Sequence, residues 1–308
     1  MWFKNLIFYR FVTPFTLSDE ALAEQLSDKA FQLCGPLDHF SQGWSAPLGA
    51  KHDQLTFTTS HCTMVCMRKE EKVLPAAVVK EFVGSKVSDI EEQQMRKVGR
   101  KEREDIKDEI LHDLLPRAFT RSAYTYAYID RQNGWMIVDS ASQKKADDLT
   151  TLLRKTLGSL AIELPTTNDM PTACMTHWLK EGNLPTGLNI EDECELKSPD
   201  ENGAIARCKG QDMASDEIQS HLEAGKLVTK LSVSWDDRLS FTLNDDLTIK
   251  RIRNSEMLQD QINDCHAETA EEKFDADFTI MCLEFSHLLP QVMNFFGGEQ
   301  SDQQSAVA

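Results

Sequence analysis

The chain has 308 residues, of which 41% are hydrophobic and 27% charged, and its formal net charge is −17. This composition excludes a disordered or fibrous protein and predicts a globular one that is long enough to bury a core of its own. No run reaches the roughly 18 to 20 apolar residues that a membrane-spanning helix needs, so we expect a cytoplasmic protein with no membrane segment.

The first third of the chain alternates strand and helix patterns. Residues 1–11 are largely apolar and read as a strand, and residues 17–31 have the apolar spacing of a helix whose N-cap is Ser18. A polar loop is expected from Cys34 to about Gly49. Residues 55–70 then alternate as one strand, and Pro75 closes this segment.

Residues 78–115 form the longest helical candidate. Apolar residues recur at helical spacing at both of its ends, whereas its middle third is almost entirely polar. This pattern predicts a helical excursion, broken as a hairpin near Gly99, that protrudes from the body instead of crossing its core. Pro116 ends the excursion.

The remaining sequence predicts an α+β fold. Residues 122–130 and 134–140 flank an Asn-Gly turn as a hairpin, and the helix that follows ends at Gly158. Further elements are a linker at 164–172, a helix at 175–182, strands at 187–198 and 204–211, a helix at 215–225, a three-strand meander at 226–254, a helix from about 270 to 296 and a frayed end at 301–308.

These elements suggest three parts. Residues 1–75 and 119–165 form the first half of a central body, and residues 76–118 form a helical tip. Residues 166–308 form the second half, which has an acidic helical C-terminus; the family resemblance described below implies that this half includes a base. Eight cysteines occur without a CxxC pair, so we expect reduced thiols.

The acidic charge is unevenly distributed. Residues 254–308 hold eleven Asp or Glu against Lys273 alone, which leaves a net charge of −7 for all the other residues together. Because charges are screened over roughly 8 Å, a polyanion responds first to the nearest side chains. The acidic total therefore does not exclude a local basic surface.

Motifs of nucleotide-driven and hydrolytic enzymes are absent from the sequence. There is no GxxxxGK[ST], GxGxxG, HExxH or GxSxG. His61, Cys62 and Cys66 could suggest zinc, but on a strand Cys62 and Cys66 share one face and favour core packing. The acidic run 191–195 could hold a hard cation, although a solvated strand edge is the simpler interpretation. We expect no metal, no cofactor and no catalysis.

A basic stretch, MRKVGRKER at 95–103, stands out in this acidic chain. On one helix Arg96, Arg100, Arg103 and Lys107 would fall within an arc of about 60°. The alternative is a solvated face with i,i+4 pairs to neighbouring carboxylates. Cations clustered in this way could bind phosphates without reading a sequence. The cations of the stretch are Arg96, Lys97, Arg100, Lys101 and Arg103.

A second signal follows Pro116. Arg117 and Arg121 flank Phe119, and an aromatic side chain between two arginines is either buried or offered to a partner.

Seven co-linear blocks resemble the bacterial RdgC family. They include MWFKNLIFYR at the start and DEILHDLLPRAF at 108–119, and the resemblance runs from Met1 to about Gly298. The other blocks are RKEEKVLP at 68–75, LLRKTLGSL at 152–160, DECELKS at 192–198, HLEAGKLVTKL at 221–231 and KFDADF at 273–278.

The resemblance implies a fold and a function. It implies a horseshoe-shaped subunit with antiparallel sheets flanked by helices and a protruding helical tip, closing into a ring-shaped homodimer. Double-stranded DNA would pass through a basic central hole, single-stranded DNA would be a second nucleic-acid partner, and access of the recombinase RecA to DNA would be restrained. Such a protein is nucleoid-associated and not an enzyme.

The resemblance also assigns roles to residues. Phe119 would lie at the tip contact that closes the dimer, with Arg117 near DNA. Lys209 and Gln211 would lie near the hole, although relatives show a further Lys where this chain has Gly210. The predicted DNA-binding residues are Arg96, Lys97, Arg100, Lys101, Arg117, Arg121, Lys209 and Gln211.

Two other classes of function stay open. One is an adaptor that binds the recombinase directly through Phe119 and the acidic tail. The other is a metal-dependent nuclease built on residues 191–195.

Overall fold

The computed structural model describes residues 1–200, 203–265 and 267–300. Within them the fold is α+β, and every strand pairing is antiparallel. The strands are β1 (Leu6–Phe11), β2 (Phe40–Ser45), β3 (Thr56–Thr59), β4 (Cys62–Val73), β5 (Phe119–Asp130), β6 (Trp135–Asp139), β7 (Ile162–Glu163), β8 (Leu188–Lys197), β9 (Ile205–Lys209), β10 (Leu227–Trp235), β11 (Leu239–Asn244) and β12 (Ile249–Asn254).

One continuous sheet joins both halves of the chain. Its order is β2-β4-β5-β6-β1-β12-β11-β10-β8-β9, with β3 added beside β4 and β7 beside β1. The halves meet where β1 contacts β12, in the single register pair Leu6–Ile249. The antiparallel sheets that the resemblance implied are therefore one sheet, because β1 pairs with β6 on one side and with β12 on the other.

Eight helices cover or extend this sheet in the described ranges. Six pack on the sheet or beside it, and two form the excursion. They are α1 (Asp19–Ser27), α2 (Ala76–Gln94), α3 (Arg100–Leu114), α4 (Gln143–Leu157), α5 (Pro171–Glu181), α6 (Asp216–Glu223), α7 (Glu256–Asn263) and α8 (Ala270–Phe295).

Two large cores lie on the sheet. Leu22 of α1 and Leu149 of α4 are fully buried in the first core. In the second, α8 places Phe278 in edge-on contact with Tyr128 of β5, at a centroid distance of 5.6 Å. The apolar run of α8 is thus part of the core. Among the described residues no helix is both long and apolar enough to cross a membrane.

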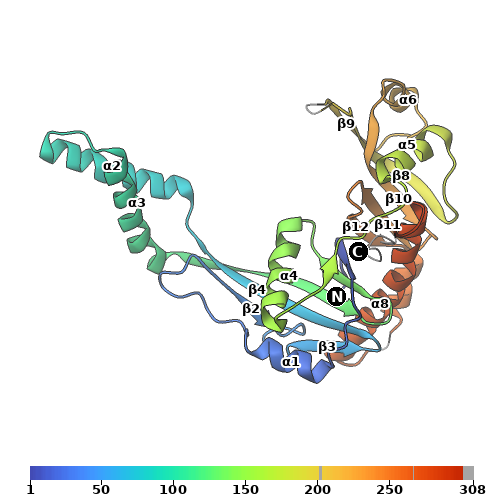
Figure 1. Cartoon of the computed structure of the whole chain (residues 1–308), viewed down its shortest axis with the longest axis horizontal. Coiled ribbons are helices and arrows are strands. Elements are labelled where there is room, and N and C mark those ends of the chain that lie inside the picture. The colour runs from blue at the N-terminus through green and yellow to red at the C-terminus, as the bar shows by residue number, and fades with distance from the viewer. Residues whose placement is uncertain (201–202, 266, 301–308) are drawn as a thin grey trace, which may run out of the picture.

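A third, small core holds the excursion together. Val79 and Val83 of α2 pack against Ile106 and Ile110 of α3. The helices are separated by residues 95–99, where Met95 ends α2 in a left-handed conformation with φ 50°. The predicted break near Gly99 is confirmed, and the hairpin stands away from the body at the end of the long strands β4 and β5 (Figure 1).

The whole molecule is elongated and curved. In Figure 1 the α2–α3 hairpin forms one end, and the region of β9 and α6 forms the other. Both ends rise on the same side of the central body, so one edge of the molecule is concave.

Three local predictions were wrong. The loop expected at 34–49 contains β2, and residues 55–70 are not one strand but the hairpin β3–β4, which turns at Ser60 with φ 50°. Helix α7 was missed. The β5–β6 hairpin is correct, but its connection spans residues 131–134. The predictions for 301–308 and for the middle of the turn at 198–204 fall outside the described residues.

Candidate nucleic-acid interface

A groove with basic walls lies where the helical hairpin leaves the sheet. The end of β4 and the facing sides of α2 and α3 enclose a cavity of about 690 Å³. Its floor is apolar and includes Val79, Val83 and Leu111. Its Lys and Arg side chains are Lys72, Lys80, Arg100, Arg103 and Lys107, with His39 beside them and Glu104 as the one carboxylate in the lining.

Charge segregation makes this groove positive. Residues 76–118 hold nine Lys or Arg and ten Asp or Glu, so the excursion as a whole is not basic. Arg100 pairs with Glu104 at 3.5 Å, but in the described part of the chain the other four Lys and Arg of the groove form no ion pair. Their charge is therefore available to an anionic ligand.

The predicted helical stripe is partly wrong. Arg100 and Arg103 lie on α3 and face the groove, but Arg96 and Lys97 lie in the connection before the helix begins. The Arg96 guanidinium binds both carboxylate oxygens of Glu102, at 2.7 and 2.5 Å, and so braces the connection. These hydrogen bonds hold the pKa of Glu102 below its ordinary value.

Lys101, Arg117 and Arg121 are exposed, but none of them lines the groove. Phe119 opens β5 opposite Val73 and has 85% of its surface exposed. It lies at the junction of hairpin and sheet, not at the far end of the hairpin. Sequence reasoning missed His39, Lys72 and Lys80, because they come from segments outside the basic stretch.

A second set of cations lies on the opposite end of the curved molecule. On one face of β8, Glu195 binds Arg207 of β9 at 2.7 Å and Lys230 of β10 at 2.9 Å. Glu193 contacts Arg251 at 2.5 Å and Lys209 at 3.8 Å. Each of these two glutamates is shared by two cations. We call this set of four cations and two glutamates the ladder, and its net charge is positive.

Glu195 is the structural centre of the ladder. Burial raises the pKa of its carboxyl, but hydrogen bonds from Arg207, Lys230 and Thr229 outweigh burial and lower that pKa to about 2. Because Arg207 and Lys230 are exposed and solvent screens their charges, the shift from 4.5 corresponds to about 2 kcal/mol of stability. Since the folded pKa lies below the unfolded one, this stability is present above about pH 4.5 and is lost as the pH falls toward 2.

We expect Glu195→Gln to lower the free energy of unfolding by about 2 kcal/mol at pH 7, because both cations lose their charged partner. Urea unfolding at pH 7 and at pH 3 measures this, and the deficit should shrink at pH 3. Glu191→Gln is the matched control, since among the residues that the structure describes Glu191 accepts a hydrogen bond only from Ser232, at 3.0 Å. A deficit that is the same at both pH values would contradict the assignment.

The predicted residues at the end of β9 differ in their freedom. Lys209 is exposed and loosely paired, whereas the Gln211 amide donates to Ser215 and Glu217 at the start of α6. Gly210 has φ +66°, and a Cβ there would meet no atom within 4 Å. The space suits a longer side chain, but the backbone conformation favours glycine.

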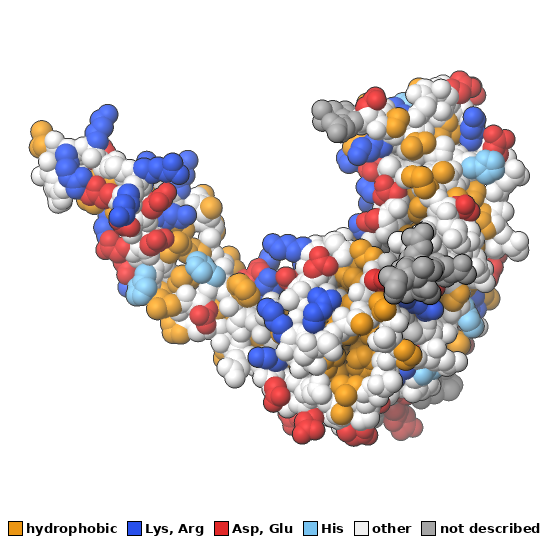
Figure 2. All heavy atoms as spheres, in the orientation of Figure 1, with side chains coloured by type: hydrophobic (Ala, Val, Ile, Leu, Met, Phe, Trp, Pro, Cys, Tyr) orange, Lys and Arg blue, Asp and Glu red, His pale blue; other side chains and the backbone are white. Residues whose placement is uncertain are grey.

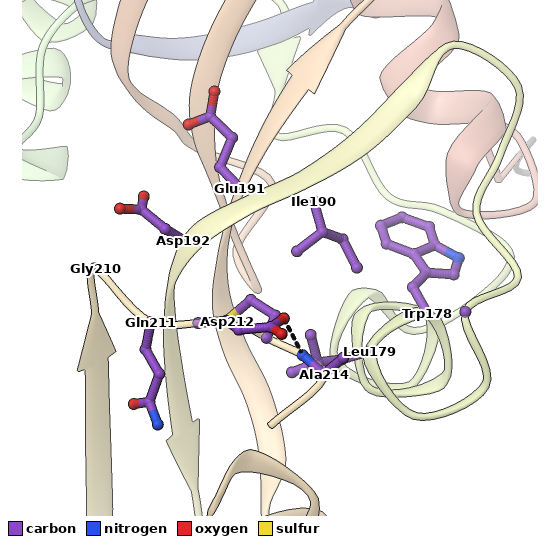
Figure 3. Close-up of a pocket in the computed structure, with 11 residues that line it drawn as sticks. Trp178, Leu179, Ile190, Glu191, Asp192, Gly210, Gln211, Asp212 and Ala214 are labelled. Atoms are coloured by element: carbon purple, nitrogen blue, oxygen red, sulfur yellow. Dashed lines mark hydrogen bonds between the residues drawn. The ribbon is translucent and has the colours of Figure 1, made fainter. Parts of the chain in front are cut away.

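An acidic hollow of about 790 Å³ lies beside this loop. Figure 3 shows Ile190 directed toward Trp178 and the side chains of Glu191 and Asp192 projecting from β8. The Asp212 carboxylate accepts a hydrogen bond from the backbone N–H of Ala214. Three carboxylates in this lining repel phosphate, so the hollow itself is not part of a nucleic-acid surface.

The candidate metal ligands are rearranged by the fold. Cys62 and Cys66 are buried, as core packing predicted, and Cys66 does not join the cluster that His61 and Cys62 form with Asp130. The ligand atoms of that cluster lie within 4.8 Å of one another, but the Asp130 carboxylate already accepts two hydrogen bonds from Asn133. In residues 191–195, Glu193 and Glu195 are taken up by the ladder.

Lys and Arg side chains are visible on both ends of the curved molecule. Figure 2 shows Lys and Arg gathered on the hairpin and, at the opposite end, along the edge that faces the concave side of the molecule. Carboxylates lie among them. Acidic side chains gather on the lower, convex edge. An anionic ligand would therefore be drawn toward the concave side of the molecule and repelled from its convex edge.

The sequence is similar to known proteins along nearly its whole length. Residues 1–299 match the family model described as "Putative exonuclease, RdgC". The chain belongs to the RdgC family. Among its RdgC relatives, the protein of Aeromonas hydrophila is 47% identical over 300 residues, which cover 97% of this chain and 99% of the relative. The RdgC protein of Tolumonas auensis is 43% identical over 302 residues, covering 98% of this chain and all of that relative.

The two kinds of description differ in what they say of activity. The relatives are named "Recombination-associated protein RdgC", and the family model carries the word exonuclease. The relatives' name thus associates those proteins with recombination, whereas the family description names a catalytic activity.

Proposed function

We propose that this chain binds double-stranded DNA without reading its sequence and restrains the action of RecA in recombination. The observation that carries the proposal is the groove at the base of the hairpin, where five Lys and Arg face one carboxylate. Neutralising phosphates requires clustered cations and no base-reading element. Single-stranded DNA offers the same phosphates and is a second ligand, and the site of action is the nucleoid in the cytoplasm.

The quaternary part of the proposal is a ring. Two horseshoe-shaped subunits would meet through the hairpin arm, including its junction with the sheet at Phe119, and through the opposite end, so that the concave edges enclose a duplex between them. Phe119 supports this assembly, since an aromatic ring that is 85% exposed is typical of an interface. The division into a body half at residues 1–75 and 119–165, a tip at 76–118 and a second half with the base at 166–308 is part of the same proposal.

No catalysis is proposed. The carboxylates that a metal-dependent nuclease would need at 191–195 are engaged by cations or spread over both faces of β8. Incubation of supercoiled plasmid with the protein and Mg²⁺ tests this. Intact plasmid is the expected result, and nicks that disappear in a Glu193→Gln variant would favour the nuclease.

A salt series tests the binding proposal. We expect the affinity for two duplexes of unrelated sequence to fall in parallel as KCl rises, with a log–log slope of roughly −0.9 for each phosphate neutralised. Fluorescence anisotropy gives both slopes. A flat response, or a strong preference for one sequence, would reject sequence-independent binding.

Phe119→Ser is expected to weaken ring closure and DNA retention while leaving folding intact, because the side chain is exposed and makes its contribution only at an interface. Sedimentation and DNA affinity measure the two effects. Leu283→Ser is the control, since Leu283 is an exposed apolar residue on α8. An unchanged dimer with unchanged DNA affinity would remove Phe119 from the interface.

The same exposed ring supports the adaptor as a second candidate function. Purified RecA retained by this protein in nuclease-treated buffer, and lost with Phe119→Ser, would favour direct protein binding. Retention that requires DNA favours the proposal above.

A further inference from the structure

The β8–β9 hairpin places two free thiols opposite each other. Cys194 of β8 and Cys208 of β9 are direct partners in the antiparallel ladder, so their side chains project from the same face. Hydrogen bonds from Ser198 to Ala204 and from Gly210 to Asp192 occur in the same alternating series. Because backbone-bonded positions recur every two residues, Cys194 and Cys208 also occupy a backbone hydrogen-bonded position. The Cα atoms of two residues opposite each other at such a position are about 5.5 Å apart. A disulfide spans about 4.4 to 6.8 Å.

The two thiols differ in access. Cys194 is 2% exposed and faces the core, whereas Cys208 is half-buried. Burial, together with contact with Cys208, raises the pKa of Cys194 to about 12. A dissolved oxidant therefore reaches Cys208 first. Cys194 lies beside it and is the resolving thiol, which attacks the oxidised Cys208 sulfur.

We propose that Cys194 and Cys208 form an oxidation site that hydrogen peroxide converts to a reversible disulfide joining β8 to β9. The Cys208 sulfur attacks one peroxide oxygen, the O–O bond breaks, and water leaves as Cys208 becomes a sulfenic acid. The Cys194 sulfur then attacks the Cys208 sulfur, loses its proton and displaces a second water. Two thiols are oxidised and one peroxide is reduced.

Reversal follows from the same geometry. An external thiol reaches the Cys208 sulfur, forms a mixed disulfide and frees Cys194, and a second thiol completes the reduction. The link would fix β9, which is the edge strand of the sheet and pairs with β8 alone. This inference does not depend on the proposed function, because it concerns the chemistry of the hairpin itself.

The chain supplies an internal comparison. Cys62 of β4 and Cys282 of α8 also contact each other, but they are 0% and 6% exposed within the main core. The two pairs share their chemistry and differ in access. Low peroxide should therefore link the hairpin pair and leave the core pair reduced.

Peroxide titration of the full-length native protein, followed by thiol blocking and peptide mapping without reductant, tests the proposal. The expected result is a fall from eight to six free thiols, with a peptide joining Cys194 to Cys208 that dithiothreitol removes. A count that stays at eight overturns it. Thiol loss without this peptide, or with Cys62–Cys282 linked first, also overturns it.

Two variants sharpen the assignment. In Cys194→Ser the Cys208 sulfenic acid has no resolving thiol, so dimedone should label Cys208 about tenfold more than in the native chain. Cys174→Ser is the matched control and should still form the hairpin disulfide. Equal dimedone labelling of Cys208 in the native chain and in Cys194→Ser would contradict the resolving role.

Discussion

Replacing Arg100, Arg103 and Lys107 together by alanine is expected to weaken duplex binding by roughly 100-fold near physiological salt and to make the salt slope shallower by about 3. All three line the groove, and Arg103 and Lys107 are not in ion pairs within the described residues. Because the contacts are to phosphate, the loss should be equal for unrelated sequences. Anisotropy across a KCl series measures both quantities.

A charge-matched control separates the groove from net charge. Lys29, Lys51 and Lys273 are exposed and lie outside the groove and the ladder. Replacing these three by alanine makes the chain equally more acidic, so affinity should change by about twofold at most. Equal losses in the two triple variants would show that total charge, and not the groove, governs binding.

Arg238→Ala is expected to destabilise the fold by about 3 kcal/mol, because it strands a buried carboxylate. Glu284 of α8 is 3% exposed, and the Arg238 guanidinium binds both of its carboxylate oxygens, with the Nε contact at 2.9 Å. These hydrogen bonds raise the pKa of Arg238. Urea unfolding, with fluorescence of the buried tryptophans as signal, measures the loss.

Two further variants test the cause. Arg251→Ala removes a pair whose Glu193 partner is partly exposed, and should cost less than about 1 kcal/mol. Arg238→Met combined with Glu284→Leu removes both charges and should recover much of the loss, since no buried charge remains unpaired. A double variant as unstable as Arg238→Ala would contradict the ion-pair explanation.

Local signals in the sequence were reliable where they act within a few residues. Ser18 caps α1 by accepting from Ala21, and Gly158 ends α4 with φ +78°, both as predicted. Strand β2 was read as loop because its segment is polar and contains Gly and Pro. A Cβ at Gly43 would approach the Phe31 backbone to 2.6 Å, so this glycine serves a close contact with a distant segment. That contact exists only in the folded chain.

The site shows the same division. The run of cations at 95–103 correctly pointed to the hairpin, but a single helical wheel put Arg96 on the stripe, where the structure has a connection. Lys72 and Lys80 join the groove because β4 ends beside α2 and α3. The periodicity of one helix cannot predict a groove that is lined by residues from β4, α2 and α3. The pairing of Cys194 with Cys208 likewise depends on strand register.

Enclosure of a duplex by two curved subunits is tested most directly by retention on DNA with and without ends. Protein is loaded on a closed circular plasmid and the sample is divided in two. In one portion the plasmid is linearised by a single cut. Both portions are then exposed to high salt, which disrupts phosphate contacts. We predict retention on the circle and loss from the cut plasmid, with Phe119→Ser lost from both. Equal loss of the unaltered protein from circular and linear DNA would contradict enclosure.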